Sequence, residues 1–291
     1  MVVDVLIYHA FSSVPGKGNP AGVVLDAGNL SDSQMQEIAK ELGFNETAFI
    51  LPDNHSIAIR YFTPGHEVPV CGHATIASMA ALAEKDLIKE NLVKIHTAAG
   101  ILDIEIRTGE QIKIGMQQTP YKEIAFGGSV DALARVLGLE ESMLDEQYPI
   151  RYVNTGLWTL LVPIRRLSYF KQMHPATKDF PGILIEQSRA SIHPFCLETY
   201  REDCQMHGRH FSSPYSGTIE DAVTGTASGA MGAYYQKYIH PRNAMQRILI
   251  EQGNEIGNEG YVEVEVPEDL SKPVKIYGTA VCSETRSVIL H

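Results

Sequence analysis

The 291-residue sequence is poor in cysteine, in aromatic residues and in positive charge, and it has no long hydrophobic run. Its four cysteines are scattered, and we expect no signal peptide, because "MVVDVLIYHAF" has no basic start and carries an Asp. We therefore expect reduced thiols in a cytoplasmic protein and no disulfide framework. No stretch reaches the ~18 apolar residues that a membrane-spanning helix needs, so we predict no membrane partner.

Basic residues are outnumbered, with 24 Lys and Arg against 35 Asp and Glu and a formal net charge of -11. A chain this acidic repels phosphate backbones and anionic membrane surfaces. No basic patch is long enough to offset this repulsion, since the densest one is the short "PIRRLSYFK". We expect no nucleic-acid partner, and a small molecule is the predicted one.

The length and the periodicity of the chain predict an α+β protein of two domains. A chain of 291 residues is long for one core, and short alternating apolar runs outnumber the helical ones. The loop-like stretch 120–128 is the candidate boundary. We therefore predict domains 1–122 and 123–274, with a C-terminal strand in 275–291 that packs back on the first domain.

Three segments of the sequence predict a helix, a loop and a strand. Ser31 and Gln34 form a capping-box pattern before a helical apolar spacing that ends at Gly43. The Gly- and Pro-rich stretch 12–22 is predicted to be a loop. The apolar "GILIEQ", residues 182–187, is predicted to be a strand.

Two segments of the chain resemble each other. "RYFTPGHEVPVCGHATIASMAAL" (60–82) and "RHFSSPYSGTIEDAVTGTASGAMGAYY" (209–235) both run from Arg-aromatic-Phe through a loop to a glycine that opens a helix of small residues. Alignment of the two glycines gives these pairs: Gly72 with Gly225, Cys71 with Thr224, His73 with Thr226, and Thr75 with Ser228. The matching context favours an internal repeat over chance similarity of small residues.

The repeat predicts two similar domains related by a pseudo-two-fold axis, each a barrel-like sheet around a slim central helix. The first turn of a helix has free N–H groups and the positive end of the dipole. If both helix starts face the cleft between the domains, they form a site for a small anion such as a carboxylate.

Cys71 and His73 admit more than one interpretation. A thiol at a helix start can be an activated nucleophile or base, but a small half-buried residue without chemistry fits the pattern equally. No acid that would orient His73 is evident from the sequence. A racemase with two thiols is disfavoured because Thr224 stands at the position equivalent to Cys71.

"CQMHGRH" carries Cys204, His207 and His210 and resembles a metal-binding cluster. On a strand, however, His207 points away from the face that the other two share, and diverging ligands cannot close one tetrahedral site. We therefore predict no metal site.

Two acidic residues are candidates for proton chemistry. Glu46, in "GFNETAFI", has apolar neighbours that would desolvate its carboxyl group and raise its pKa, as general acid–base catalysis requires; a solvated strand-edge acid is the alternative. Asp221 precedes the second small-residue helix, where a plain helix-capping role is the alternative. Its neighbour Glu220 is expected to face solvent.

Four motifs in order resemble the signature blocks of the phenazine-biosynthesis PhzF-like family, which has the diaminopimelate-epimerase-like fold. They are "GNPAGVVL", "NETAFI", "RYFTP…CGHATIA" and "EDAVTGTASGA", and they extend from residue 19 to residue 235. Such an ordered set is far more specific than any single motif.

The resemblance implies a cofactor-free isomerase, in which Glu46 moves a proton between carbons of a small unsaturated carboxylate. It implies that His73 and Asp221 assist. The residues that it implies for substrate binding are Asn19, Gly72, Thr75, Gly225 and Thr226. It also implies a homodimer. A cysteine-dependent epimerase and a metabolite-binding protein without activity remain as alternatives.

Overall fold

The computed structural model describes residues 1–53 and 56–290, and the chain divides into two compact units. The N-terminal unit is Met1–Gln117 together with the C-terminal segment that begins at Tyr277, and the C-terminal unit is Gln118–Ile276. The boundaries set from the sequence, 122/123 and 274/275, lie close to these limits. That the units are independent domains related by a pseudo-two-fold axis stays a prediction.

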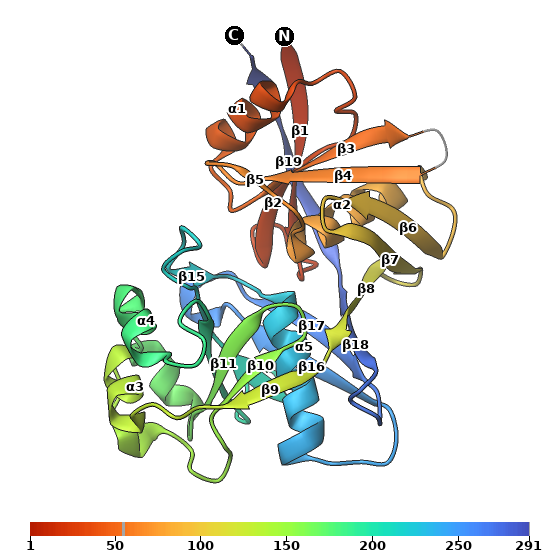
Figure 1. Cartoon of the computed structure of the whole chain (residues 1–291). Coiled ribbons are helices and arrows are strands. Elements are labelled where there is room, and N and C mark those ends of the chain that lie inside the picture. The colour runs from red at the N-terminus through yellow and green to blue at the C-terminus, as the bar shows by residue number, and fades with distance from the viewer. Residues whose placement is uncertain (54–55, 291) are drawn as a thin grey trace. The chain divides into compact units, whose positions relative to one another are not determined.

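The described residues of the N-terminal unit form two helices and a mixed sheet (Figure 1). The helices are α1 (Asp32–Leu42) and α2 (Gly72–Glu84). The strands are β1 (Val2–Ala10), β2 (Asn19–Val24), β3 (Thr47–Asp53), β4 (Ser56–Phe62), β5 (Glu67–Val68), β6 (Leu92–Thr97), β7 (Gly100–Arg107), β8 (Lys113–Pro120) and β19 (Ala280–Ile289). β8 runs across the first limit between the units, and β18 (Pro273–Gly278) runs across the second.

The C-terminal unit has three α-helices and ten further strands, and four 3₁₀ turns connect them. Its helices are α3 (Val130–Val136), α4 (Phe180–Ile183) and α5 (Gly225–Tyr234), the last continued by a π turn. The strands are β9 (Lys122–Ala125), β10 (Arg151–Asn154), β11 (Trp158–Pro163), β12 (Ser191–Cys196), β13 (Met206–Gly208), β14 (His210–Phe211), β15 (Glu220–Asp221), β16 (Gln246–Gln252), β17 (Gly260–Val266) and β18 (Pro273–Gly278). The 3₁₀ turns are Glu141–Met143, Leu167–Gln172, Thr177–Asp179 and Asn254–Ile256.

The two units share one order of strand pairing. In the N-terminal unit, β1 is antiparallel to β2, β2 is parallel to β3, β3 is antiparallel to β4, and β4 is parallel to β6. In the C-terminal unit, the same relations hold for β10, β11, β12, the β13–β14 pair and β16. This correspondence supports the internal repeat, and the element content confirms the α+β fold class.

A slim helix packs inside the sheet of each unit. α2 packs against β1, β2, β3 and β19, and every residue from His73 to Leu82 is buried. α5 packs against β10, β11 and β17, and only Thr226 along it is partly exposed. A methyl group on Gly232 would come within 2.7 Å of Val264, so the sheet leaves no room for a larger residue there.

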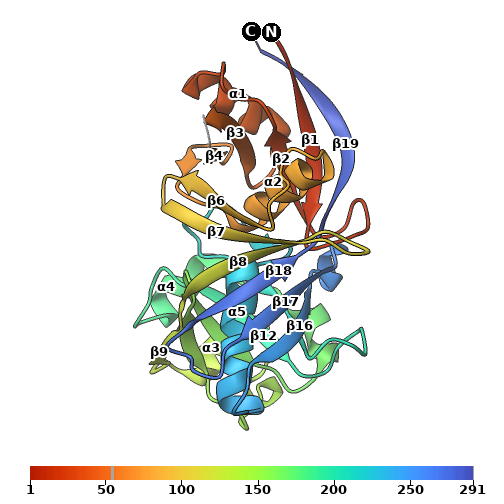
Figure 2. The ribbon, with the colours of Figure 1, turned by 90° about the vertical axis from the view of Figure 1, so that its right-hand side faces the viewer.

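The end strands of the N-terminal unit hold both termini. β1 pairs along its length with β19, and the Met1 ammonium group donates to the Leu290 carbonyl at 3.0 Å. Figure 2 shows the two long strands side by side with both chain ends at one end of the pair. The segment that follows residue 276 therefore completes the first sheet.

Of the local predictions, the helix after Ser31 is confirmed, and the loop at residues 12–22 needs correction. The Ser31 helix is confirmed: Ser31 and Gln34 form the reciprocal capping box, and Gly43 ends the helix at a left-handed φ of 70°. The predicted loop 12–22 is too long, because β2 already begins at Asn19, which pairs with Ala10. Residues 122–125 of the predicted boundary loop form β9.

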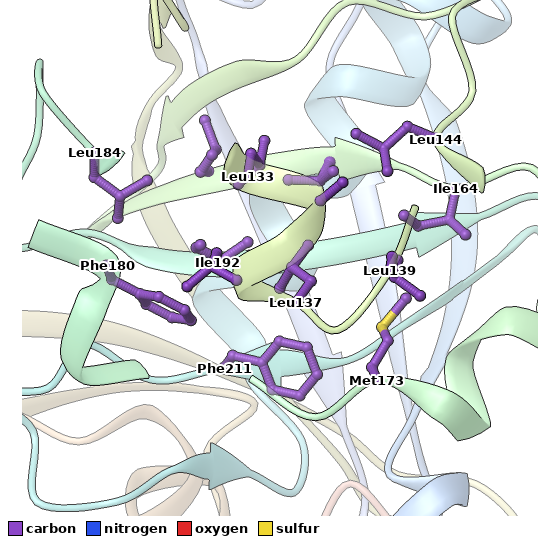
Figure 3. Close-up of a cluster of buried hydrophobic side chains, with 14 of the residues drawn as sticks. Leu133, Leu137, Leu139, Leu144, Ile164, Met173, Phe180, Leu184, Ile192 and Phe211 are labelled. Carbon is purple, nitrogen blue, oxygen red and sulfur yellow. The ribbon is translucent and has the colours of Figure 1, made fainter. Parts of the chain in front are cut away.

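The predicted strand 182–187 is wrong. Pro181 stands in the first turn of α4, where its fixed φ favours a helix start. The apolar residues there follow a spacing of four, so Phe180 and Leu184 both enter the core cluster around Leu133 and Leu137 (Figure 3). Ile185 is 71% exposed, which a buried strand would not allow.

A fully buried ion cluster lies in the C-terminal unit. The Nδ1 atom of His207 is 3.1 Å from a Glu251 oxygen, and its Nε2 atom is 3.2 Å from a Glu255 oxygen. Burial lowers the pKa of His207, but its contacts with the two carboxylates outweigh burial and raise the pKa above 6.5. Burial raises the pKa of Glu255, and the contact with His207 outweighs it and lowers that pKa below 4.5.

No helix in the described part of the chain is long and apolar enough to cross a membrane.

We expect the His207 cluster to stabilise the protein most between about pH 4.5 and pH 6.5. The folded pKa of His207 is raised, so its contribution is complete below pH 6.5 and is lost as the pH rises through the folded value. The folded pKa of Glu255 is lowered, so its contribution is complete above pH 4.5 and is lost as the pH falls through the folded value.

Urea unfolding followed by the fluorescence of Trp158, the single tryptophan, measures this dependence. His207→Gln should remove the loss of stability on the alkaline side of the profile. An alkaline side that is equally steep in the variant would contradict the assignment.

Candidate active site

The helices α2 and α5 begin without a side-chain cap. Neither Cys71 nor Thr224, their N-cap residues, makes a capping hydrogen bond, and neither first turn contains an acidic residue. The helices α1 and α3, by contrast, are capped by Ser31 and Ser129. The two central helices thus keep first-turn N–H groups and a positive dipole end for another acceptor.

Space is open at the start of α2. A methyl group on Gly72 would meet no atom within 4 Å. Steric crowding therefore does not explain the glycine, in contrast to Gly232 in α5. A small residue at this place lets a ligand approach the backbone N–H groups closely.

Glu46, Cys71 and His73 come together beside this helix start. The Nε2 atom of His73 lies 3.4 Å from Oε2 of Glu46, and its Nδ1 atom lies 3.5 Å from the Cys71 sulfur. Cys71 and His73 are buried, each 8% exposed, and the Glu46 side chain is 22% exposed. The three side chains thus form one partly accessible cluster, with the imidazole between thiol and carboxylate.

Strand register explains why Glu46 reaches His73. Thr47, the first residue of β3, pairs with Phe62, the last residue of β4. The chain continues from Phe62 through β5 into α2, so the residue before Thr47 lies at the same end of the sheet as the helix start. Glu46 is the acid beside His73 that the sequence did not reveal.

Thr75 and Asn19 are both buried, whereas a simple ligand-binding side chain would be exposed to the ligand. The Thr75 hydroxyl donates to the Cys71 carbonyl at 2.7 Å, and it therefore accepts from the Tyr61 hydroxyl at 2.6 Å. Its N–H also donates to the Cys71 carbonyl, at 3.0 Å. Asn19 is 1% exposed at the start of β2. Substrate binding by either residue stays a prediction, and the contacts of Thr75 favour a structural role.

Asp221 lies on β15 of the C-terminal unit, just before Thr224, the N-cap residue of α5. Its carboxylate accepts a hydrogen bond of 2.6 Å from the Thr224 hydroxyl. Gln252 fixes the same turn, because it donates to the Asp221 carbonyl at 2.8 Å and accepts from the Thr224 N–H at 3.1 Å. Asp221 thus orients the N-cap residue of α5, and it lies outside the helix's first turn.

A pocket of about 350 Å³ opens at the start of α5 within the C-terminal unit. Its lining is rich in hydroxyl groups and includes one guanidinium group, that of Arg189. The residues that line it are Leu157, Trp158, Thr159, Gln187, Arg189, Ala190, Ser191, His210, Ser212, Ser213, Ser216, Thr224, Thr226 and Ala227. This volume and this mixture of apolar and polar groups suit a small organic anion.

The histidine of this pocket is uncharged. His210 and His193 are buried, and their Nδ1 atoms lie 3.1 Å apart. Burial lowers the pKa of both residues, and for His210 it outweighs the nearby Asp221. The pair therefore offers the pocket a neutral imidazole.

Register places the pocket at the positions that correspond to the Glu46 cluster. Thr47 pairs with Phe62 as Ile192 pairs with Phe211, so Ser191 occupies the position of Glu46. The aligned helix starts likewise place Thr224 and Thr226 at the positions of Cys71 and His73, and Tyr61 corresponds to His210. At the positions of Glu46, Cys71 and His73, the N-terminal unit thus carries ionisable groups. At the same positions the C-terminal unit carries hydroxyl groups.

A bidentate ion pair supports each helix start. Arg60 on β4 donates to both oxygens of Glu67 on β5, at 2.7 Å each. Arg209 donates to both oxygens of Glu220 on β15, at 2.8 and 2.6 Å. The expectation that Glu220 faces solvent is therefore wrong, because the buried Arg209 holds it.

Both segments of the repeat begin with Arg-aromatic-Phe, and this shared arginine is the sequence signal for the two ion pairs. An arginine that is partly or fully buried needs a compensating acid nearby.

His207 and His210 diverge as expected, since His207 faces Glu251 and His210 faces His193. The expected shared face of Cys204 and His210 is wrong, because Cys204 precedes β13 and interacts with Glu251, the partner of His207.

The chain matches known proteins along most of its length. A model of the family described as phenazine biosynthesis-like protein (PhzC-PhzF) matches residues 8–286, which confirms the resemblance seen in the motifs. The uncharacterized isomerase YfhB of Bacillus subtilis is 48% identical over 288 residues, 97% of each chain. The trans-2,3-dihydro-3-hydroxyanthranilate isomerase of Pseudomonas chlororaphis is 28% identical over 289 residues, 98% of this chain and 99% of the other.

A solved structure has the same fold. The crystal structure of a PhzF-family phenazine biosynthesis protein from Bacillus anthracis matches with a TM-score of 0.96 and 46% identity, and 100% of each chain is covered.

The two ion pairs should differ in their contribution to stability. Glu220→Gln leaves the Arg209 charge buried, since that side chain is only 8% exposed, and we expect a loss of about 3 kcal/mol in the free energy of unfolding. Glu67→Gln acts on the more exposed Arg60 pair and should cost no more than ~1 kcal/mol. Urea unfolding of the two matched variants measures both values. Equal losses would contradict the buried role of the Arg209 pair.

Proposed function

The chain belongs to the phenazine biosynthesis-like family of isomerases, and from this premise we propose that it moves a proton between carbons of a small unsaturated carboxylate without a cofactor. Glu46 is the acid/base. The observation that supports this role most is the 3.4 Å contact between Glu46 and His73 beside the uncapped start of α2.

The proposed reaction is balanced within the substrate. The Glu46 carboxylate removes a proton from one carbon, so that a C–H bond breaks and its electron pair enters the conjugated system. The protonated Glu46 then returns the proton to another carbon of the same system, and a new C–H bond forms. Exchange of the carried proton with water labels the product in heavy water.

His73 is proposed to position Glu46 and to balance its charge. Because its ring nitrogen lies close to the Glu46 oxygen, it holds the carboxyl group in one orientation at the rim of the cluster. Its burial at 8% exposure keeps the ring fixed. Such a pair suits repeated gain and loss of one proton.

Each uncapped helix start is proposed as a binding site for a carboxylate in its own unit. N–H groups at Gly72 in α2 and at Gly225 and Thr226 in α5 have the polarity that a carboxylate needs. Within the C-terminal unit, the hydroxyl-lined pocket at the start of α5 offers neutral donors and acceptors to polar groups of a ligand. A relative acts on trans-2,3-dihydro-3-hydroxyanthranilate, so this compound is the first substrate to test.

Asp221 is proposed to assist in the same reaction. Its hydrogen bond to Thr224 fixes the start of α5 and leaves the carboxylate beside the polar pocket. Asn19 is proposed to bind substrate only on the strength of the resemblance, and the homodimer likewise stays a prediction.

A cysteine-dependent epimerase is the second candidate, and one observation favours it. Cys71 has an imidazole nitrogen at 3.5 Å, and that imidazole contacts Glu46, so the thiol has both a base and an orienting acid. Inversion at carbon needs a second base, however, and Thr224 stands where a paired thiol would be required. Because a hydroxyl group stands at the position of the second thiol, Glu46 is favoured as the proton carrier.

We expect Glu46→Gln to lower isomerisation by at least about a hundredfold, because an amide cannot carry the proton. The measurement is the transfer of deuterium from heavy water into the dihydro-hydroxyanthranilate probe, followed by proton NMR. Glu41→Gln, an exposed substitution in α1, is the matched control and should keep full activity. Undiminished exchange in Glu46→Gln would refute the assignment. A ligand that stabilises the protein yet is recovered unlabelled from the wild type would indicate a binding protein.

Cys71→Ser separates the two enzyme candidates. If Glu46 carries the proton, this variant should keep isomerase activity within about tenfold of the wild type, because the thiol is only a neighbour of His73. If activity is lost in Cys71→Ser and kept in Glu46→Gln, the epimerase candidate replaces the isomerase proposal.

A further inference from the structure

We propose that Cys71, His73 and Glu46 form a binding site for a thiophilic divalent cation, with Zn²⁺ as the best match. The binding is a property of the three side chains alone. Its consequence, inhibition of the enzyme, rests on the proposed function, because the same residues would then be withdrawn from proton transfer.

The donor atoms are spaced as ligands of one ion. An imidazole binds one ion through one ring nitrogen, and Nε2 of His73 is the nitrogen that faces Glu46. From Nε2, the sulfur of Cys71 lies 4.0 Å away and Oε2 of Glu46 lies 3.4 Å away. All three donor groups lie within 4.8 Å of one another. Zinc bonds of about 2.3 Å to sulfur and 2.0–2.1 Å to nitrogen place tetrahedral ligands roughly 3.5 Å apart. Small rotations of the side chains therefore suffice to close the site.

The donor types match zinc. A thiolate, an imidazole and a carboxylate are the three kinds of protein ligand that Zn²⁺ takes. Three protein ligands leave a fourth position for water, and the open space at Gly72 accommodates it. Binding releases the thiol proton to solvent as the bond from sulfur to the ion forms.

The cluster differs from other groups of similar composition in this chain. Among the residues that the structure describes, it is the single set of three or more such donors that converges on one point. At the corresponding positions of the C-terminal unit, the residues are Ser191, Thr224 and Thr226, which lack thiolate, imidazole and carboxylate. A metal site would therefore belong to the N-terminal unit.

The test uses Co²⁺, whose bond to a thiolate gives a charge-transfer absorption. Titration of the wild-type protein with Co²⁺ alone should produce this band at one equivalent, and Zn²⁺ should abolish it by displacement. In Cys71→Ser the band should be absent, and Zn²⁺ should bind at least about tenfold more weakly. Cys282→Ser removes the partly exposed cysteine of β19 and should leave the band unchanged.

A second variant guards against loss of folding. His73→Gln should keep the thiol but weaken Zn²⁺ binding by a similar factor, and circular dichroism shows whether each variant is folded. A cobalt–thiolate band that persists in Cys71→Ser, or Zn²⁺ affinity that is equal in the wild type and both site variants, would overturn the site. Because these measurements contain no substrate, they are independent of whether Glu46 catalyses an isomerisation.

Discussion

The packing of a slim helix inside each sheet is the constraint on which the rest of the structure depends. α2 and α5 pack against strands, and most of their residues have small side chains. Gly232 shows the limit, since one added methyl group would meet Val264. A helix enclosed in this way has its polar groups free only at its ends. Each unit therefore presents the uncapped start of its central helix as a site for an anion.

The two units share one order of strand pairing and one central helix, but different side chains surround the two helix starts. The N-terminal unit sets ionisable groups around its helix start, with His73 between Cys71 and Glu46. The C-terminal unit sets hydroxyl groups and a neutral histidine around a pocket at the equivalent place. Duplicated folds commonly diverge at the site while the scaffold is kept. The division favours proton chemistry in one unit and recognition of polar groups in the other.

Much of the fold could be predicted because it depends on patterns among residues that are close in the sequence. The capping box at Ser31 and the repeated helix starts depend on neighbouring residues, and four ordered motifs revealed the family. The contact of Glu46 with His73 could not be found in this way, since it depends on the register of β3 against β4. The strand predicted at 182–187 failed because a short apolar run has no unambiguous period. Glu220 was misplaced because its partner Arg209 lies eleven residues away, between β13 and β14.

The central claim is that Glu46 and His73 act as one unit in moving the proton. A double-mutant cycle of Glu46→Gln and His73→Gln, with solvent-deuterium exchange as the readout, tests it most directly. The account predicts strongly non-additive losses, so that the double variant is about as slow as the slower single variant. Losses that multiply would show that the two residues act independently and would contradict the account.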